Sequence, residues 1–299
     1  MIQQEGVKNL MQKIATPEGT KAVLNKYAFI FQKKFGQNFL IDPHVLDKII
    51  RSAHITKEDC VLEIGPGIGS VTQALIENAG KVISVEIDNQ LIPILEEQFG
   101  KEDNFQLIHK DILKVDLRAL IQKESPDRPI KVVANLPYYI TTPIIMTLLE
   151  NELPIESITV MVQKEVADRL ASPPGSKQYG AITVSVNYFA EPYLVANVPR
   201  NCFMPRPNVD SAVLKLTLNK EPVVEVNNKD QMFRIIKSSF LQRRKTLLNT
   251  LGANAELGLS KERLKELLDE SGIGATTRGE TLSLQEFARL SNYIDAHRG

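Results

Sequence analysis

The chain has 299 residues, of which 43% are apolar and 24% charged, and its formal net charge is zero. This composition is typical of a soluble globular protein with one large domain or two ordinary ones. No apolar run approaches the ~20 residues that cross a membrane, and the N-terminus lacks the apolar core and cleavage site of a secretory signal. The two cysteines, Cys60 and Cys202, favour a reducing cytosol and argue against a metal site built on thiolates.

Residues 45–165 alternate short β-rich runs with helical runs, which is the pattern of a mostly parallel sheet with helices on both faces. The predicted strands cover residues 60–64, 81–86, 105–109, 131–134 and 157–162. The predicted helices cover residues 70–79, 89–99, 142–150 and 164–170. The fold class predicted for this part of the chain is therefore α/β.

Residues 181–189 alternate apolar and polar side chains, which by itself predicts a strand. Residues 209–218 alternate more clearly and are predicted to form a late strand. The segment between them, residues 198–207, contains Pro199, Pro205 and Pro207. So much proline predicts a loop without any regular element.

After about Leu218 only helical patterns remain, over residues 229–238, 241–251, 261–271 and 284–296. Ser260 is suited to begin the third of these helices and Gly272 to end it. Ser283 and Glu286 form a capping-box pattern at the start of the fourth. Residues 219–299 are therefore predicted to be a small all-α C-terminal domain that follows a larger domain of residues 1–218.

Basic residues are clustered even though the net charge is zero. Residues 231–255 contain no acidic residue and five basic ones, namely Arg234, Lys237, Arg243, Arg244 and Lys245. Lys26, Lys33 and Lys34 lie in a second stretch without acids. Such clusters can contact phosphates locally, because charge interactions are screened within ~10 Å. A solvated helix face is the alternative interpretation.

A glycine-rich loop joins the predicted strand 60–64 to its helix. Gly65, Gly67 and Gly69 allow the backbone to turn sharply and a ligand to approach closely. Glu86 ends the next predicted strand, where a carboxylate can accept hydrogen bonds from both hydroxyls of a ribose. Asp111 follows the third strand and is placed to accept a hydrogen bond from an adenine amino group.

Two ligands compete for this loop. A dinucleotide favours the spacing G-x-G-x-x-G, with backbone N–H groups facing a pyrophosphate. Here Ser70 occupies the sixth position, and the spacing is G-x-G-x-G with Pro66 inside it. Together with Glu63, two residues before the first glycine, this pattern suits S-adenosylmethionine, which has no phosphates. A tight turn without a ligand is the remaining alternative.

The sequence Asn135-Leu136-Pro137-Tyr138 follows a predicted buried strand. A purine amino group is a poor nucleophile, because its lone pair is delocalised into the ring. The Asn135 side-chain oxygen and the Leu136 carbonyl can each accept a hydrogen bond from one N–H group of this amine, which frees its lone pair. Pro137 fixes the turn, and Tyr138 offers a ring for base stacking, worth about 1–3 kcal/mol. A plain β-turn is the alternative interpretation.

Phe203, in the proline-rich loop, is predicted to be partly exposed and to close over the base opposite Tyr138. Alternatively, it packs the loop onto the core. The target base has to be unpaired or flipped out of a helix to reach such a site. Orientation of the amine in line with a methyl sulfonium is expected to supply much of the acceleration, without a strong general base.

In combination these motifs resemble the ribosomal RNA adenine N6,N6-dimethyltransferases, and specifically the bacterial small-subunit (16S) enzymes of the kasugamycin-resistance methylase family. The resemblance extends from about Lys33 to the C-terminus, and residues 1–20 have no assigned role. The matching segments are residues 34–40, 63–69, 85–88, 135–138, 162–170, 174–180 and 203–211.

The resemblance implies a Rossmann-like class I methyltransferase domain, a helical C-terminal domain, and a helix instead of a strand at residues 181–189. It implies that S-adenosylmethionine is the methyl donor, without a metal, and that its site is lined by Asn38, Leu40, Gly65, Glu86, Asp111 and Asn135. The expected catalytic residues are Asn135, Tyr138 and Phe203.

The implied reaction dimethylates two adjacent adenines near the 3′ end of 16S rRNA during assembly of the small subunit. The expected partner is the small ribosomal subunit, and the protein is expected to be a cytoplasmic monomer with no membrane partner. The residues expected to contact RNA are Lys33, Lys34, Arg243, Arg244 and Lys245.

Three alternatives remain. The first is the related large-subunit rRNA dimethylase that confers macrolide resistance, although residues 163–170 and 174–180 resemble the small-subunit enzyme better. The second is a non-catalytic ribosome-assembly factor, which the intact Asn135, Tyr138 and Glu86 disfavour as the sole role. The third is an NAD-dependent oxidoreductase, which the glycine spacing disfavours.

Overall fold

The structure is a computed structural model that describes residues 13–254 and 257–297. The described residues form two compact units. Unit 1 is drawn from Met1–Ile144, Pro154–Val162 and Val195–Val213. Unit 2 is drawn from Ile145–Leu153, Gln163–Leu194 and Leu214–Gly299. No helix in the described part of the chain is long and apolar enough to cross a membrane.

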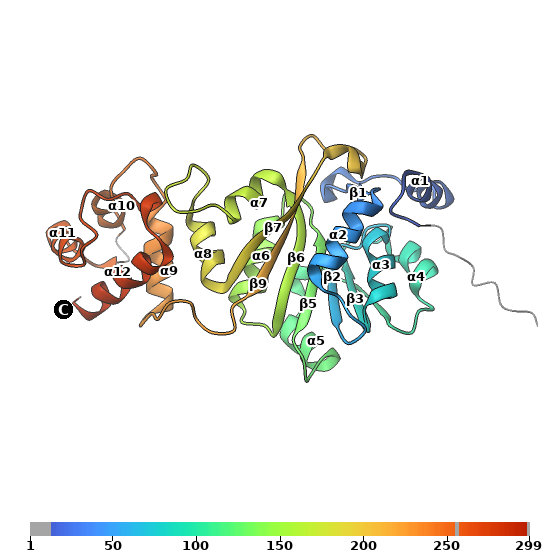
Figure 1. The fold of residues 1–299 in the computed structure, drawn as a ribbon, viewed down its shortest axis with the longest axis horizontal. Coiled ribbons are helices and arrows are strands. Elements are labelled where there is room, and N and C mark those ends of the chain that lie inside the picture. Colours follow the sequence, from blue (N-terminus) through green and yellow to red (C-terminus); the bar gives the residue numbers. More distant parts are fainter. Residues whose placement is uncertain (1–12, 255–256, 298–299) are drawn as a thin grey trace, which may run out of the picture. The chain divides into compact units, whose positions relative to one another are not determined.

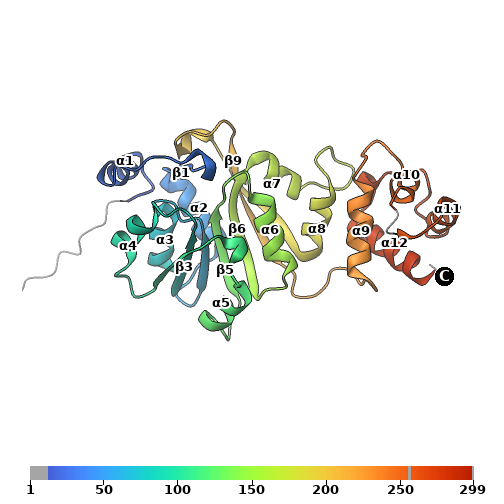
Figure 2. The same cartoon turned by 180° about the vertical axis from the view of Figure 1, so that it is seen from behind.

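A seven-stranded sheet has the order β4-β3-β2-β5-β6-β9-β7, and its strands β3, β5 and β6 can be followed from both sides in Figures 1 and 2. The strands are β2 (Cys60–Ile64), β3 (Lys81–Glu86), β4 (Phe105–His109), β5 (Ile130–Asn135), β6 (Ile155–Gln163), β7 (Ala190–Val198) and β9 (Ser211–Leu218). All pairs from β4 to β6 are parallel. These parallel strands confirm the predicted α/β class.

The sheet has a reversal of strand order beside β2. From β2 the chain moves to β3 and β4 on one side and then returns to β5 on the other. In open α/β sheets a ligand crevice forms at such a reversal, outside the carboxyl ends of the strands. The ends of β2 and β5 are neighbours, because Ile64 pairs with Ala134. The glycine loop and Asn135 therefore begin at the same edge of the sheet.

In its described part, unit 1 contains five α-helices, and the sequence patterns predicted only some of them. Its helices are α1 (Pro17–Lys26), α2 (Pro43–Ala53), α3 (Ser70–Asn78), α4 (Ile92–Phe99) and α5 (Leu117–Glu124), with 3-10 turns η1 (Lys33–Phe35) and η2 (Ile112–Lys114). In Figure 1, α2 lies in front of the strands near β2. Val45, Leu75 and Leu95 from three of these helices join one buried cluster with Val61 and Val82 of the sheet.

Helices α1, α2 and α5 were not predicted. The signal for α2 was present, because the Asp42 side chain accepts hydrogen bonds from the His44 and Val45 N–H groups and Pro43 occupies the first turn. An N-cap acid followed by proline is therefore a helix start that the alternation pattern overlooked.

Residues 181–189 form helix α8 (Ala181–Phe189), so the strand predicted from alternation is wrong and the helix implied by resemblance is confirmed. Its Thr183, Val184 and Val186 are buried, and the helix packs against α7 (Lys164–Leu170) and α9 (Lys229–Ser239). Packing on two neighbouring helices overrides the β propensity of valine and threonine.

The proline-rich segment contains regular structure, contrary to the prediction. Residues Arg200–Cys202 form a 3-10 turn, η3, and β8 (Phe203–Met204) pairs antiparallel with β1 (Phe39–Leu40). Pro199 and Pro205 flank these elements and leave the N–H groups of the two-residue strand free to pair.

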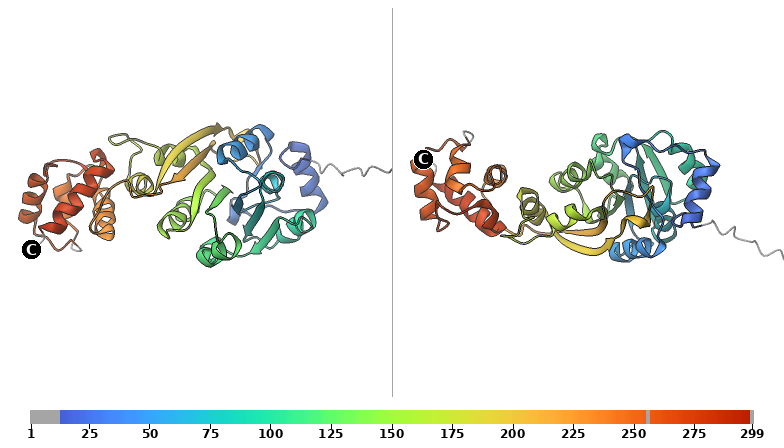
Figure 3. Two further views of the ribbon diagram at one scale, coloured as in Figure 1. Left: turned by 60° about the horizontal axis from the view of Figure 1, so that its bottom comes forward. Right: turned by 90° about the horizontal axis from the view of Figure 1, so that it is seen from above.

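The remaining helices gather in unit 2, where the C-terminal set is coloured orange to red in Figure 3. They are α6 (Thr141–Glu150), which begins in unit 1, followed by α7, α8, α9, α10 (Leu247–Gly252), α11 (Lys261–Glu270) and α12 (Leu284–Ala296). The Ser260 cap and the Ser283–Glu286 capping box are confirmed. The helix predicted over residues 241–251 is wrong at its start, because residues 241–246 form turns and Thr246 caps α10.

Candidate functional site

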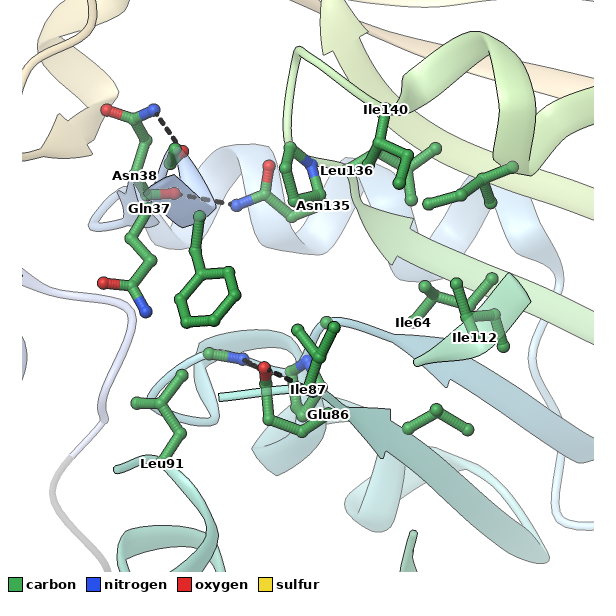
Figure 4. A pocket seen from close by; sticks show the side chains of 18 of the residues that line it. Gln37, Asn38, Ile64, Glu86, Ile87, Leu91, Ile112, Asn135, Leu136 and Ile140 are labelled. Carbon is green, nitrogen blue, oxygen red and sulfur yellow. Dashed lines mark hydrogen bonds between the residues drawn. The ribbon is translucent and has the colours of Figure 1, made fainter. Parts of the chain in front are cut away.

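A cavity opens at the carboxyl ends of β2, β3, β4 and β5, at the reversal of strand order. It is lined by residues 35–40, 64–67, 70–71, 85–87, 91, 110–112, 135–140 and 144. Figure 4 shows Asn38 and Asn135 on one side of the cavity and Glu86 on the other. Every residue predicted to line the donor site is on this wall, namely Asn38, Leu40, Gly65, Glu86, Asp111 and Asn135.

The glycine loop has backbone conformations that other residues rarely adopt. Gly65, Gly67 and Gly69 have φ values of 67°, 61° and 94°. A Cβ atom on Gly67 would lie 2.9 Å from the Phe39 ring, and one on Gly69 would lie 2.4 Å from the Phe99 ring. Nothing lies within 4 Å of a Cβ at Gly65, so the loop leaves open space where it borders the cavity.

Glu86 presents a fixed carboxylate to the cavity although it is only 5% exposed. Its Oε1 accepts hydrogen bonds from the Ile87 and Asp88 N–H groups, both at 2.8 Å, and its Oε2 accepts one from Gly67 at 3.3 Å. Burial raises the pKa of this carboxyl, and these three hydrogen bonds oppose that shift. A carboxylate held in this way can accept hydrogen bonds from the two hydroxyls of a ribose.

Glu63 is part of the glycine pattern, but its side chain does not line the cavity. It is 1% exposed, and its Oε2 accepts hydrogen bonds from Ser84 at 2.6 Å and Thr72 at 2.8 Å. Its Oε1 has no hydrogen-bond partner among the described residues. Burial raises the pKa of Glu63 to about 7. This carboxyl therefore joins α3 and β3 to β2 underneath the loop.

Asp111 follows β4 and lines the cavity with one oxygen already engaged. Its Oδ1 accepts a hydrogen bond from the Leu113 N–H at 3.1 Å and caps η2. This hydrogen bond fixes the Asp111 carboxylate just beyond the end of β4. Its other oxygen can accept a hydrogen bond from an adenine amino group.

Asn135 and Leu136 place two acceptors together at the end of β5. The Asn135 Nδ2 donates to the Asn38 carbonyl at 2.9 Å, which leaves Oδ1 as an acceptor (Figure 4). The Leu136 N–H donates to the Met161 carbonyl at 3.1 Å, while its own carbonyl accepts no hydrogen bond from the described residues. Two oxygens are thus available for the two N–H bonds of one amine.

Tyr138 is half-buried on the same wall, and its hydroxyl forms a 2.6 Å hydrogen bond with Ser211 Oγ. Burial raises the pKa of this phenol, so the phenol stays neutral. The hydrogen bond with Ser211 holds the ring at its hydroxyl end. The Pro137 carbonyl accepts hydrogen bonds from Ile140 N–H and Thr141 Oγ1, which closes the turn. Tyr139, which the sequence did not single out, also lines the cavity and is 59% exposed.

Phe203 is 3% exposed and belongs to the buried cluster that contains Phe39, so the prediction of partial exposure is wrong. The pairing of Phe203 with Leu40 in β8 and β1 draws the ring into the core. Phe203 does not line the cavity in this structure. Stacking on a target base would require movement of the loop, and this role stays a prediction.

The basic residues expected to contact RNA have different environments. Arg243 Nε pairs with Glu280 at 2.5 Å, and its guanidinium donates to the Ser176 carbonyl at 2.9 Å. Arg244 and Lys245 are exposed. Lys34 is exposed with its Nζ 4.5 Å from the Phe35 ring centroid, whereas the side chain of Lys33 lies outside the described part of the structure. Arg243 is exposed as well, so these two contacts hold its guanidinium within unit 2, and its contact with RNA stays a prediction.

No group of three histidine, cysteine, aspartate or glutamate side chains within residues 13–254 and 257–297 could hold a metal ion. The glycine conformations, the open space beside Gly65 and the buried Glu86 carboxylate fit a ligand with a ribose. The fold and this edge of the sheet define a Rossmann-like methyltransferase.

The family model for ribosomal RNA adenine dimethylase matches residues 28–296. The chain is 59% identical, over 95% of its length and 99% of the relative, to ribosomal RNA small subunit methyltransferase A of Lachnoclostridium phytofermentans. Among solved structures it resembles a dimethyladenosine transferase from Plasmodium falciparum, with a TM-score of 0.74, 28% identity and coverage of 86% and 98% of the two chains. It also resembles the 23S rRNA methyltransferase ErmE, with a TM-score of 0.65, 28% identity and coverage of 86% and 100%. The chain belongs to the ribosomal RNA adenine dimethylase family.

Replacement of Glu63 by glutamine is expected to stabilise the fold at high pH. The folded state raises the pKa of Glu63 from 4.5 to about 7 and so favours the protonated form. The stability that comes from this protonation is complete below pH 4.5 and is lost as the pH rises through about 7. The advantage of Glu63→Gln in free energy of unfolding should therefore grow by up to about 2.5 kcal/mol between pH 5 and pH 8.

Urea unfolding at both pH values measures this difference. Glu77→Gln, on the exposed face of the same helix α3, is the control and should show no such growth. An advantage of Glu63→Gln that is equal at both pH values would contradict the raised pKa.

Proposed function

We propose that the chain transfers methyl groups from S-adenosylmethionine to N6 of two adjacent adenines near the 3′ end of 16S rRNA. The products are N6,N6-dimethyladenosines, formed during assembly of the small subunit. The observation that carries this proposal is the pair of acceptors, Asn135 Oδ1 and the Leu136 carbonyl, in one cavity with Glu86 and Asp111. The 59% identity to a protein named as a small-subunit methyltransferase supports the choice of substrate.

The residues divide the work between the two substrates. S-adenosylmethionine supplies an electrophilic methyl sulfonium when bound. Glu86 accepts hydrogen bonds from the ribose hydroxyls of this donor, and Asp111 accepts one from its adenine amino group. Asn135 and Leu136 bind the N–H atoms of the target amine, which turns its lone pair away from the ring. Tyr138 stacks on the target base and so fixes the direction of attack.

This arrangement needs no side chain with a strongly basic pKa. As the N–C bond forms, the bond between the methyl carbon and the sulfonium sulfur breaks and S-adenosylhomocysteine leaves. The amine becomes cationic, and one of its N–H protons is then acidic enough to leave to water. Asn135 Oδ1 and the Leu136 carbonyl stabilise the developing positive charge, because both are acceptors aimed at the N–H atoms. Catalysis would therefore rest on orientation and on fixed dipoles.

The alternatives have less support. The solved 23S rRNA methyltransferase is 28% identical to the chain, compared with 59% for the small-subunit relative. A purely non-catalytic assembly factor would not need Glu86 to be held by three backbone N–H groups at the cavity. Assembly checking can accompany catalysis in the same protein.

We further propose that residues 1–218 act as the methyltransferase domain and that residues 219–299 dock on the small subunit. The helical composition of the second segment and its exposed Arg244 and Lys245 support this division. The protein would work as a cytoplasmic monomer without a metal.

Incubation with radiolabelled S-adenosylmethionine and separated ribosomal subunits that lack the modification tests the substrate. Label is expected in the small-subunit rRNA, and nuclease digestion should release it as N6,N6-dimethyladenosine. Label in the large subunit, or in neither subunit, would overturn the proposal.

Asn135→Ala removes one of the two amine acceptors and should lower kcat by at least ~100-fold, as the loss of a transition-state hydrogen bond does. Binding of the small subunit should persist, because the cavity wall is small relative to an RNA-docking surface. The matched control is Asn78→Ala, which makes the same change at the exposed end of α3. Turnover retained by Asn135→Ala would exclude the amine-orienting role.

Arg244→Gln combined with Lys245→Gln should weaken binding to the small subunit. Two lost phosphate contacts should make the slope of log K against log salt shallower by about 1.4–1.8. Arg243→Gln is the comparison, because its contacts with Glu280 and Ser176 predict a loss of thermal stability in place of a change in salt slope. An unchanged slope in the double variant would show that these two residues are only solvated.

A further inference from the structure

Asp88 lies two residues after Glu86 and has no part in the reaction described above, yet it is 1% exposed. Its Oδ1 accepts hydrogen bonds from the Gln32 side chain at 2.8 Å and the Gln90 N–H at 3.0 Å. Its Oδ2 accepts one from the Gln37 side chain at 2.6 Å. A buried carboxylate without partners is costly, so these contacts strongly favour one position of the segment that carries Gln32 and Gln37.

Residues 32–38, which we call the clamp segment, are also braced internally. The Gln32 N–H donates to Gln37 Oε1 at 3.0 Å, and Asn38 Nδ2 donates to the Gly36 carbonyl at 2.9 Å. Gly36 has a φ of 57°, which allows the turn between them. These contacts hold the clamp segment together, and the Asp88 carboxylate attaches it to the end of β3.

The last residue of the clamp segment determines how the Asn135 amide is oriented. The Asn38 carbonyl can only accept a hydrogen bond, so Asn135 must turn its Nδ2 toward it. The rotated amide would place Oδ1 against the Asn38 oxygen, and two acceptors repel one another. Figure 4 shows the amide with its nitrogen facing Asn38 and its oxygen turned away. The position of Asn38 thus decides whether an oxygen is available for the target amine.

Asp88 also contacts the donor side of the cavity through its backbone. Its N–H donates to Glu86 Oε1 at 2.8 Å. The side chain and the backbone of this one residue therefore reach the two halves of the site, the clamp segment next to Asn135 and the carboxylate that faces the ribose.

We propose that Asp88 is a positioning residue for methyl transfer, because its carboxylate holds the clamp segment where the Asn38 carbonyl orients the Asn135 amide. This proposal rests on the proposed function, since it assigns Asn135 to the target amine. It assigns no contact between Asp88 and either substrate. Because the clamp segment also lines the donor cavity through residues 35–38, loss of the carboxylate should weaken binding of the methyl donor to some extent and lower kcat by a much larger factor.

Two variants break the attachment from opposite sides. Asp88→Asn replaces a carboxylate oxygen by an NH₂ group that faces glutamine donors. Gln32→Ala removes a partner of the same carboxylate, and Gln32 does not line the cavity. Asp103→Asn is the matched control, because Asp103 is exposed in the loop before β4.

The full-length variants are compared in turnover with small subunits, in binding of S-adenosylhomocysteine by calorimetry, and in hydrogen exchange of residues 32–38. Asp88→Asn should lower kcat by about 100-fold, the cost of misplacing a reacting group by about 1 Å. Gln32→Ala should lower kcat by at least ~10-fold, and the double variant should lose no more than Asp88→Asn, because both act on one contact. The affinity for S-adenosylhomocysteine should fall by a much smaller factor than kcat, because Gly65, Glu86 and Asp111 still line the donor site, and the KM for the subunit should change by less than about threefold. Exchange should be faster in both variants and unchanged in Asp103→Asn.

The outcomes separate this proposal from the proposed function. Faster exchange with unchanged kcat, or a fall in S-adenosylhomocysteine affinity as large as the fall in kcat, would overturn the positioning role. Unchanged exchange in Asp88→Asn would overturn it as well, while turnover by the wild type would leave the proposed function standing. A wild type that methylates no small-subunit rRNA would overturn both. If Asp88→Asn fails to fold, Gln32→Ala decides the question.

Discussion

The hydrogen bond from the Asn135 amide to the Asn38 carbonyl joins residues that are 97 positions apart in the chain. On one side of it is the end of β5, which the parallel sheet fixes beside the glycine loop. On the other side is a segment with little regular structure of its own, held by side chains and by the short pairing of β1 with β8. In the proposed function, the chemistry of the cavity depends on this bond, because it decides which atom of the Asn135 amide faces the substrate.

The part of the site that lies on the sheet edge could be predicted from the sequence. Glu86 and Asn135 end strands with a clear apolar pattern, Gly65 and Asp111 follow such strands, and the carboxyl ends of parallel strands meet at one edge. The strand ends therefore supply most of the geometry before any packing is known. Correct strand assignments were therefore enough to predict these residues of the methyl-donor site.

The rest depends on contacts between distant segments, which local patterns do not reveal. Phe203 was expected at the surface because prolines surround it, but pairing with Leu40 buries it. Arg243 resembled its basic neighbours in sequence, yet Glu280 and Ser176 engage it. Asp88 binds Gln32 and Gln37 across 56 and 51 positions, a relation that no spacing rule contains.

In the proposed function, the pair of acceptors at Asn135 and Leu136 has a consequence for a reaction that occurs twice on one nitrogen. An unmodified adenine amine has two N–H bonds, one for each oxygen, whereas a singly methylated amine keeps only one. During the second transfer one of the two oxygens must face a methyl group, with which it forms no comparable hydrogen bond. The intermediate is thus held less firmly than the starting base, and its escape competes with completion of the modification.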